Sequence, residues 1–155
     1  MTSIRVSLVD VYVMRRIGER VECLVLRRAA GGRCPGSWET VHGHIEPGER
    51  PAEAATRELA EETGLAPERL YNLSRVESFY QHRIDEVALV PVFVAIVAED
   101  VKIRLGPEHD RFEWLDAAQA DGRFAWPRER RALADIVALL ASGNAGVIDD
   151  VLRVC

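Results

Sequence analysis

Apolar and polar residues alternate over much of the first half of the chain. Residues 4–14 and 21–28 are rich in β-branched side chains, and a polar stretch containing Gly18 separates them. This pattern predicts two strands paired as a hairpin. Glycine and proline predict a loop over residues 29–37, and residues 38–41 predict a short further strand.

Two longer apolar runs occupy the second half. Residues 74–83 and 86–98 predict strands joined by a tight turn, with residues 66–73 as a connector before them. The run 86–98 is the most apolar in the chain, so it predicts a central strand, in which Pro91 requires a bulge or a position without a ladder hydrogen bond. Shorter stretches predict two more strands, at residues 101–105 and 111–115.

Two segments are typical of helices. Residues 51–63 begin with proline, which suits the first helical turn, and precede Gly64, which suits the left-handed conformation past a helix end. A shorter helical turn is predicted after Asp116, through residue 120. Residues 127–142 also begin with proline and carry an apolar stripe, which consists of Leu133, Ile136, Val137 and Leu140.

The order of these elements, strands and helix followed by strands and helix, predicts a mixed α/β fold. A mixed central sheet would be covered by helices on both faces, as an α/β/α sandwich whose main helices are 51–63 and 127–142. The length suits one domain over residues 1–155. Residues 145–155 leave two alternatives open, pairing with a sheet edge or with a second subunit in a homodimer.

Charge and composition narrow the classes of partner. The net charge of −5 argues against a nucleic acid polymer as ligand, because backbone binding requires a basic surface. No apolar run is long enough to span a membrane, and residues 1–13 lack the features of a secretory leader. Three cysteines without metal-ligand spacing fit a reducing, cytoplasmic location.

Three carboxylates share one side of the helix predicted at residues 51–63. Glu58, Glu61 and Glu62 stand at positions i, i+3 and i+4, where like charges repel, and two of them lie at the helix end that disfavours anions. One interpretation is a solvated acidic face. The other is a site for a hard divalent cation, Mg²⁺ or Mn²⁺, which oxygen ligands prefer.

The residues around these carboxylates favour the second interpretation. Gly43, Glu49, Arg57, the three glutamates, Gly64 and Leu65 have fixed spacing over residues 43–65, which read GHIEPGERPAEAATRELAEETGL. This stretch resembles a complete Nudix box. The resemblance implies the Nudix fold, an α/β/α sandwich, and hydrolysis of a diphosphate linkage in a nucleotide-like small molecule.

The resemblance also assigns roles to the residues that match the box. It makes Glu58 and Glu62 metal ligands, and it makes Glu61 a ligand of a further metal or a partner of metal-bound water. A backbone carbonyl of His42 or Gly43 would complete the coordination. The implied cofactor is Mg²⁺, with Mn²⁺ as an alternative.

A second group of implied roles concerns Arg57 and the general base. In the family, the arginine that matches Arg57 pairs with a loop glutamate and holds the geometry of the site, which here predicts a pair with Glu49. The base often lies outside the box, and Glu108 is the best candidate because it precedes a short predicted strand. Glu99 and Glu113 are alternatives.

Several residues outside the helix are candidate contacts for substrate. Arg28 and Arg83 stand at predicted strand ends and are phosphate contacts or solvated ends. Trp38 stacks on a flat substrate group or fills the core. His42 and His44 contact phosphate or metal-bound water, act as a general acid, or are solvated loop residues.

The end of the chain carries a further resemblance. The elements EH at residues 108–109, FEWLDAAQA at 112–120 and AWPRERRALADI at 125–136 resemble the corresponding part of bacterial dihydroneopterin triphosphate and dATP pyrophosphohydrolases. This resemblance makes Trp126 a candidate for stacking on a pterin or purine ring, with packing at a helix end as the alternative.

The sequence is therefore compatible with three functions. The first is pyrophosphate release from a nucleoside- or pterin-triphosphate-like substrate. The second is hydrolysis of another diphosphate, such as ADP-ribose, a dinucleotide or a diadenosine polyphosphate. The third is a nucleotide-sensing Nudix module without catalysis, and the retention of all box glutamates argues against it.

Overall fold

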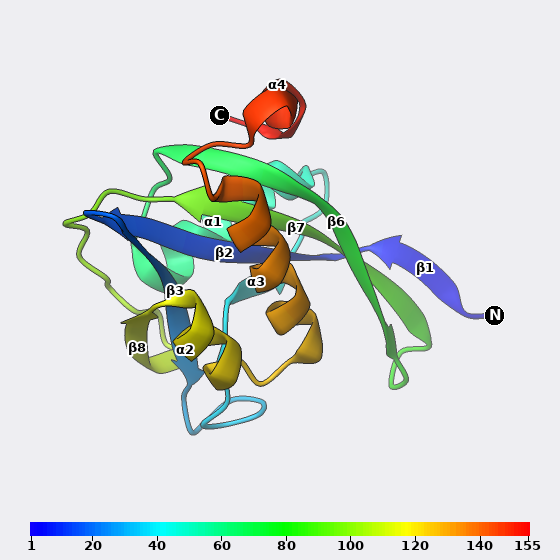
Figure 1. The fold of residues 1–155 in the computed structure, drawn as a ribbon. Helices are drawn as coiled ribbons and strands as arrows, with labels where there is room; N and C mark the ends of the chain where they lie inside the picture. The colour runs from blue at the N-terminus through cyan, green and yellow to red at the C-terminus, as the bar shows by residue number, and fades with distance from the viewer.

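The computed structural model describes all 155 residues and contains one mixed eight-stranded sheet with helices on both faces (Figure 1). The predicted α/β class is therefore confirmed. The strands are β1 (Ser3–Val6), β2 (Leu8–Ile17), β3 (Arg20–Arg28), β4 (Trp38–Glu39), β5 (Val41–His44), β6 (Arg69–Gln81), β7 (Glu86–Ile96) and β8 (His109–Leu115). The helices are α1 (Pro51–Thr63), α2 (Ala117–Arg123), α3 (Pro127–Leu140), the 3₁₀ turn η1 (Gly146–Ile148) and α4 (Asp149–Leu152).

The apolar strand β7 lies inside the sheet, as its composition predicts. It pairs in parallel with β1 and β2 on one side and antiparallel with β6 on the other. Along the path β1-β7-β2-β3-β4, β5 also pairs with β2, and β8 pairs with β3. Pro91 is accommodated near an irregularity in the β6–β7 ladder, between Asn72 and Val76.

Strand alternation divides the core into two clusters, one on each face of the sheet. One cluster lies under α1 and includes Val11, Leu59 and Phe93. The other lies under α2 and α3 and includes Tyr12 and Leu133. Ala54 and Ala55 are fully buried, and these small side chains bring α1 close to the sheet.

Several predicted boundaries in the first part of the chain are wrong. The strand predicted at residues 4–14 is divided at Ser7, so that β1 and β2 are separate strands. The Ser7 N–H donates to the Leu89 carbonyl, and the Ser7 carbonyl accepts from the Ile45 N–H. The connector predicted at 66–73 is also wrong, because β6 begins at Arg69. Its register with β7 continues at residues 69–72, and Ser74 takes a positive φ at the irregularity.

The strand predicted at 101–105 does not form. The backbone N–H groups of Arg104 and Gly106 instead donate to the carbonyls of Thr63 and Glu62, at 2.8 and 3.1 Å. The segment thus satisfies the free carbonyls at the C-terminal end of α1. Its apolar residues, Val101, Ile103 and Leu105, pack against the cluster under α1.

The C-terminal segment contacts a sheet edge of its own chain. The Val154 N–H donates to the Leu70 carbonyl at 2.7 Å, and Tyr71 and Arg153 form an antiparallel bridge. The segment therefore pairs with the edge of β6. Helix α3 ends at Leu140, two residues before its predicted end, and a turn leads to this segment.

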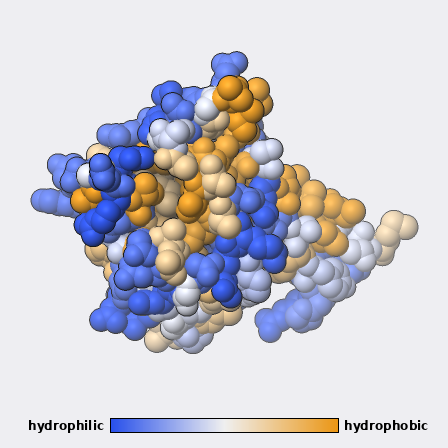
Figure 2. All heavy atoms as spheres, in the orientation of Figure 1, coloured by the Kyte–Doolittle hydropathy of each residue, from blue (hydrophilic) through white to orange (hydrophobic).

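Strand β1 and the β6–β7 hairpin project beyond the helices (Figure 1). Figure 2 shows apolar side chains along this projection and beside α3. On the projection, the exposed side chains include Ile4, Val6, Val76 and Tyr80. No helix of the structure has the length and apolar character needed to cross a membrane.

Candidate metal and diphosphate site

Strand β5 places the backbone of Gly43 directly beneath α1. A Cβ atom added to Gly43 would overlap the carboxyl group of Glu58, so only glycine allows this approach. The Glu58 side chain is 12% exposed, and burial, partly offset by Arg57, raises the pKa of its carboxyl group. The first predicted metal ligand therefore lies against the backbone of the residue predicted to supply a carbonyl.

Arg57 joins the box loop to the helix. Its Nε and Nη2 donate to the two carboxylate oxygens of Glu49 at 2.8 and 2.9 Å, and Nη2 also donates to the His44 carbonyl at 2.8 Å. The predicted Arg57–Glu49 pair is thus present in a bidentate form. The pKa of Glu49 is lowered to about 2, mainly by its hydrogen bond to Arg57.

Arg57 also determines where two of the box carboxylates lie. Its Nη1 donates to Glu58 at 2.9 Å and to Glu61 at 3.3 Å. No group of three or more His, Cys, Asp or Glu side chains is arranged to hold a metal ion. The Glu61 side chain is 58% exposed, so it borders the site from solvent.

Glu62 is buried, so the interpretation of the three glutamates as a solvated acidic face is wrong for this residue. Residues 104–106 cover the end of α1, and Glu62 is 4% exposed. Both of its carboxylate oxygens are buried without a hydrogen-bond partner. Burial, together with the charges of Glu108 and Glu58, raises its pKa well above the ordinary value.

The chemistry of these residues fits a divalent cation. A buried carboxylate without a partner costs free energy unless a cation compensates its charge, and Glu62 is such a group near Glu58 and the backbone of His42. Hard oxygen donors are the ligands that Mg²⁺ and Mn²⁺ prefer. Glu58 and Glu62, with a carbonyl of β5, are the residues that would hold the ion.

We expect Mn²⁺ binding to weaken as the pH falls. Glu58 and Glu62 have raised pKa values, so protons compete with the metal for these oxygens above pH 4.5, the ordinary value for glutamate. Titration of Mn²⁺ at pH 8, 7 and 6, followed by electron paramagnetic resonance, measures this competition. An affinity that stays constant over this range would contradict the assignment of the two ligands.

A second buried group lies behind Glu62. His109, 4% exposed, places Nε2 3.0 Å from Oε1 of Glu39 and Nδ1 3.8 Å from Oε2 of Glu62. Arg28 Nη1 lies 3.3 Å from the same Glu39 oxygen and 3.5 Å from Glu108. Burial opposes ionisation of Glu39, but the His109 hydrogen bond and the Arg28 charge lower its pKa.

A β-bulge brings His109 to this place. Arg27 is opposite Arg111 and Arg28 is opposite His109, so Asp110 is the extra residue of β8. Without it, alternation would direct His109 away from the α1 face on which Arg28 and Glu39 lie. Sequence reasoning missed Glu39 and His109 as site residues, although the EH element at 108–109 contains the histidine.

A pocket with a volume of about 370 Å³ opens beside this group. It is rich in arginine, with Arg28, Arg33, Arg128 and Arg131, and its other lining residues include Glu39, His42, Phe79 and Trp126. Trp126 is 40% exposed, and the Arg128 guanidinium lies 5.3 Å from its ring centre. A flat ring could stack on Trp126, and several anionic groups could pair with the arginines of this pocket.

Buried carboxylates hold the polar residues of this pocket. Asp10 accepts from Arg128 Nε at 2.9 Å, and its other oxygen lies 2.6 Å from His42 Nδ1. Burial alone would raise the pKa of Asp10, but these two partners lower it. Glu129 is fully buried and accepts from the Thr40 N–H at 2.6 Å, which ties α3 to the strand region before the box.

The other residues expected from sequence to contact substrate or to act as the base lie outside this pocket. Trp38 packs against the core under α3 with Arg123 4.7 Å from its ring centre, and it does not line the pocket. Arg83 lies in the turn between β6 and β7, also outside the pocket lining. Glu113 pairs with Arg123 at 3.0 Å, and Glu99 lines a different pocket.

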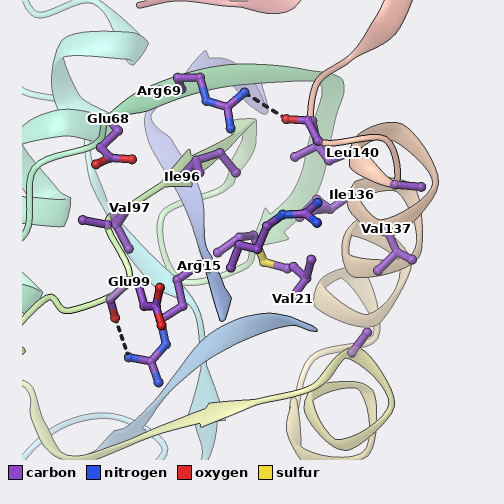
Figure 3. Close-up of a pocket in the computed structure, with 16 residues that line it drawn as sticks. Arg15, Val21, Glu68, Arg69, Ile96, Val97, Glu99, Ile136, Val137 and Leu140 are labelled. Carbon is purple, nitrogen blue, oxygen red and sulfur yellow. Dashed lines mark hydrogen bonds between the residues drawn. The ribbon is translucent and has the colours of Figure 1, made fainter. Parts of the chain in front are cut away.

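That second pocket lies at the C-terminal end of α3 (Figure 3). Ile136, Val137 and Leu140 form its apolar wall, and Arg15 and Arg69 donate to the carbonyls of Glu99 and Gly143. It contains no residue of the box. Helix α3 therefore contributes to two separate pockets, with Arg128 and Arg131 at its beginning and the apolar residues at its end.

Comparison with known proteins assigns the family. The model of the NUDIX domain matches residues 5–136. The chain is 33% identical over 102 residues to the asymmetrical bis(5'-nucleosyl)-tetraphosphatase of Rattus norvegicus, covering 64% of this chain and 67% of that relative. The chain therefore belongs to the NUDIX domain family.

Other relatives differ in length or in sequence. An octanoyltransferase of Myxococcus xanthus is 35% identical over 119 residues, which are 72% of this chain but 31% of that protein. The chain thus spans about a third of that relative's length. The E. coli dihydroneopterin triphosphate pyrophosphohydrolase superposes with a TM-score of 0.72 and 22% identity, over 89% of this chain and 99% of that one, and shares the fold.

Proposed function

We propose that the chain hydrolyses a phosphoanhydride bond in a nucleoside- or pterin-triphosphate-like substrate, with Mg²⁺ as cofactor, and releases pyrophosphate. The observation that carries this proposal is the contact of Arg28 with both Glu39 and Glu108. Through Arg28, the arginine-rich pocket adjoins the buried carboxylate Glu62. If the ring of the substrate stacks on Trp126 and its phosphates pair with the arginines, the diphosphate linkage would lie toward α1.

The proposed reaction is displacement at phosphorus. Water attacks a phosphorus atom, the bridging P–O bond breaks, pyrophosphate leaves and the nucleoside monophosphate or its pterin counterpart remains. A bound Mg²⁺ supplies charge neutralisation for the phosphates and a lower pKa for water. Glu108, which is 55% exposed and 3.5 Å from Arg28, is the residue we assign to accept the proton from the attacking water.

A second candidate substrate is a dinucleoside polyphosphate. Four arginines line the pocket, against two acidic residues, Glu39 and Glu77. Three of these arginines also pair with carboxylates of the protein, which are Glu39, Asp10 and Glu77. The support for this candidate is therefore the rat relative, which is a bis(5'-nucleosyl)-tetraphosphatase by name.

A panel of nucleoside triphosphates, dihydroneopterin triphosphate, ADP-ribose and diadenosine tetraphosphate, assayed with Mg²⁺, tests the proposal. Pyrophosphate together with a monophosphate product supports the first candidate. ATP and AMP from diadenosine tetraphosphate support the second. Binding of these compounds without any hydrolysis would contradict both and indicate a sensing module.

Replacing Trp126 with alanine is expected to raise KM about tenfold or more with little change in kcat. Stacking of a base on an aromatic side chain contributes about 1–3 kcal/mol, and each 1.4 kcal/mol is a factor of ten in affinity. The measurement is steady-state kinetics on the best substrate of the panel.

The Trp126→Phe variant, which keeps an aromatic ring, serves as the matched control and should recover most of the affinity. If the alanine variant lowers the melting temperature and leaves KM unchanged, Trp126 only packs at the end of α3, and the substrate role is wrong.

A further inference from the structure

The carboxylate assigned to the metal is in contact with a buried pair that the box does not include. Glu39 and His109 are 8% and 4% exposed, and they come from β4 and β8, two strands that flank β3. His109 Nε2 is 3.0 Å from Glu39, and the opposite ring nitrogen faces Glu62 at 3.8 Å. The imidazole thus lies between two carboxylates.

The polar atoms around this contact are incompletely paired. His109 Nδ1 and both oxygens of Glu62 are buried without a hydrogen-bond partner, whereas His109 Nε2 and Glu39 are paired. Buried polar groups are nearly always satisfied, so unpaired ones require an explanation. For Glu62, a bound cation would provide it, because the carboxylate would then have a partner in addition to the nearby histidine.

The fold retains this arrangement at a structural cost. The bulge at Asp110 interrupts the β3–β8 ladder and turns His109 toward Glu62. Arg28 balances the buried charge of Glu39 at 3.3 Å. An apolar residue at 109 would fill the same space without any of these compensating groups, so packing alone does not account for the pair.

On the basis of the proposed metal site, we propose that Glu39 and His109 are positioning residues for Glu62. Glu39 holds the imidazole by its hydrogen bond, and the imidazole limits the Glu62 carboxylate to orientations that face Glu58 and the backbone of β5. Outer partners of this kind orient metal ligands, and their loss typically costs 10- to 100-fold in metal affinity.

The test is the Kd for Mn²⁺, measured by electron paramagnetic resonance without substrate. His109→Leu and Glu39→Ala should each raise the Kd about 10- to 100-fold. Because the two residues act as a unit, the double variant should have about the same Kd for Mn²⁺ as the single variant with the higher Kd. Glu39→Gln, which keeps an acceptor for His109, should recover most of the affinity.

Arg111→Gln is the matched control, since Arg111 lies in β8 two residues after His109 but is exposed. Its Kd should stay within twofold of the wild type. Variants that fold, as judged by the melting temperature without metal, and that bind Mn²⁺ like the wild type would overturn the proposal.

If the His109→Leu and Glu39→Ala variants do not fold, a measurement on the wild type tests the proposal. The ¹⁵N resonances of the His109 imidazole should shift on addition of Mg²⁺, and an unchanged spectrum at saturating Mg²⁺ would overturn the proposal. Failure of the proposed function looks different. In that case the wild type binds Mn²⁺ and responds to these substitutions but hydrolyses none of the panel.

Discussion

The Glu62→Gln variant is expected to lose Mg²⁺-dependent turnover by about a thousandfold and, without metal, to melt at a higher temperature than the wild type. The first effect follows because a bound metal contributes several kcal/mol to transition-state stabilisation, and each 1.36 kcal/mol is a factor of ten in rate. The second follows from the burial of Glu62 without a hydrogen-bond partner.

The sign of the stability change comes from the pKa. Burial raises the pKa of Glu62 in the folded protein well above the ordinary value of 4.5. Relative to the unfolded chain, this group stabilises the fold below pH 4.5, and that contribution is lost as the pH rises toward the folded pKa. Near neutral pH the charge therefore opposes folding, and glutamine removes it.

The measurements are kcat/KM with Mg²⁺ and calorimetric melting in a chelator at pH 7 to 8. Glu61→Gln is the control for stability, because it is the same substitution on the same helix but at a position that is 58% exposed. It should leave the melting temperature nearly unchanged. A Glu62→Gln protein that is less stable than the wild type and retains full turnover would show that Glu62 has neither role.

The second large effect is expected for Gly43→Ala. The new methyl group would overlap the Glu58 carboxyl group, which must then move away from the backbone of β5. We expect Mn²⁺ affinity and turnover to fall by roughly two orders of magnitude, and stability to change little, because the displaced atoms are the flexible end of the Glu58 side chain. Mn²⁺ titration, kinetics and denaturant unfolding measure these three quantities.

Gly122→Ala is the matched control. Gly122 lies in α2, and no atom lies within 4 Å of the position where its Cβ would be. Alanine there should leave activity unchanged and stabilise the helix by up to about 1 kcal/mol. If Gly43→Ala behaves like this control, Glu58 is not confined by the β5 backbone, and the cradle formed by Gly43 is unimportant.

Taken together, the residues of the box have two distinct physical roles. Arg57 and Glu49 form a rigid, charge-assisted pair that joins loop to helix. Glu62 is a buried carboxyl group whose ionisation opposes folding of the metal-free protein, and Glu58 lies against the backbone of Gly43. We propose that the first role maintains the geometry of the site and that the second gives it affinity for a divalent cation.

The sequence by itself determines the local elements and the box. Proline at position 51, Gly64 and the spacing of the glutamates define α1 over its full length, because helix signals act within a few residues. The pairing of Glu49 with Arg57 is equally predictable from the box. Strand boundaries are less predictable from sequence, since β6 begins at Arg69 only because β7 supplies the hydrogen-bond partners for its first residues.

Only the tertiary structure shows which distant residues complete the site. His109 faces Glu62 because of a bulge in the pairing of β8 with β3, and register is set by long-range hydrogen bonds that no local pattern specifies. The burial of Glu62 likewise depends on residues 104–106, which cap α1 instead of forming the predicted strand. The sequence thus determines the carboxylates, and packing determines their surroundings.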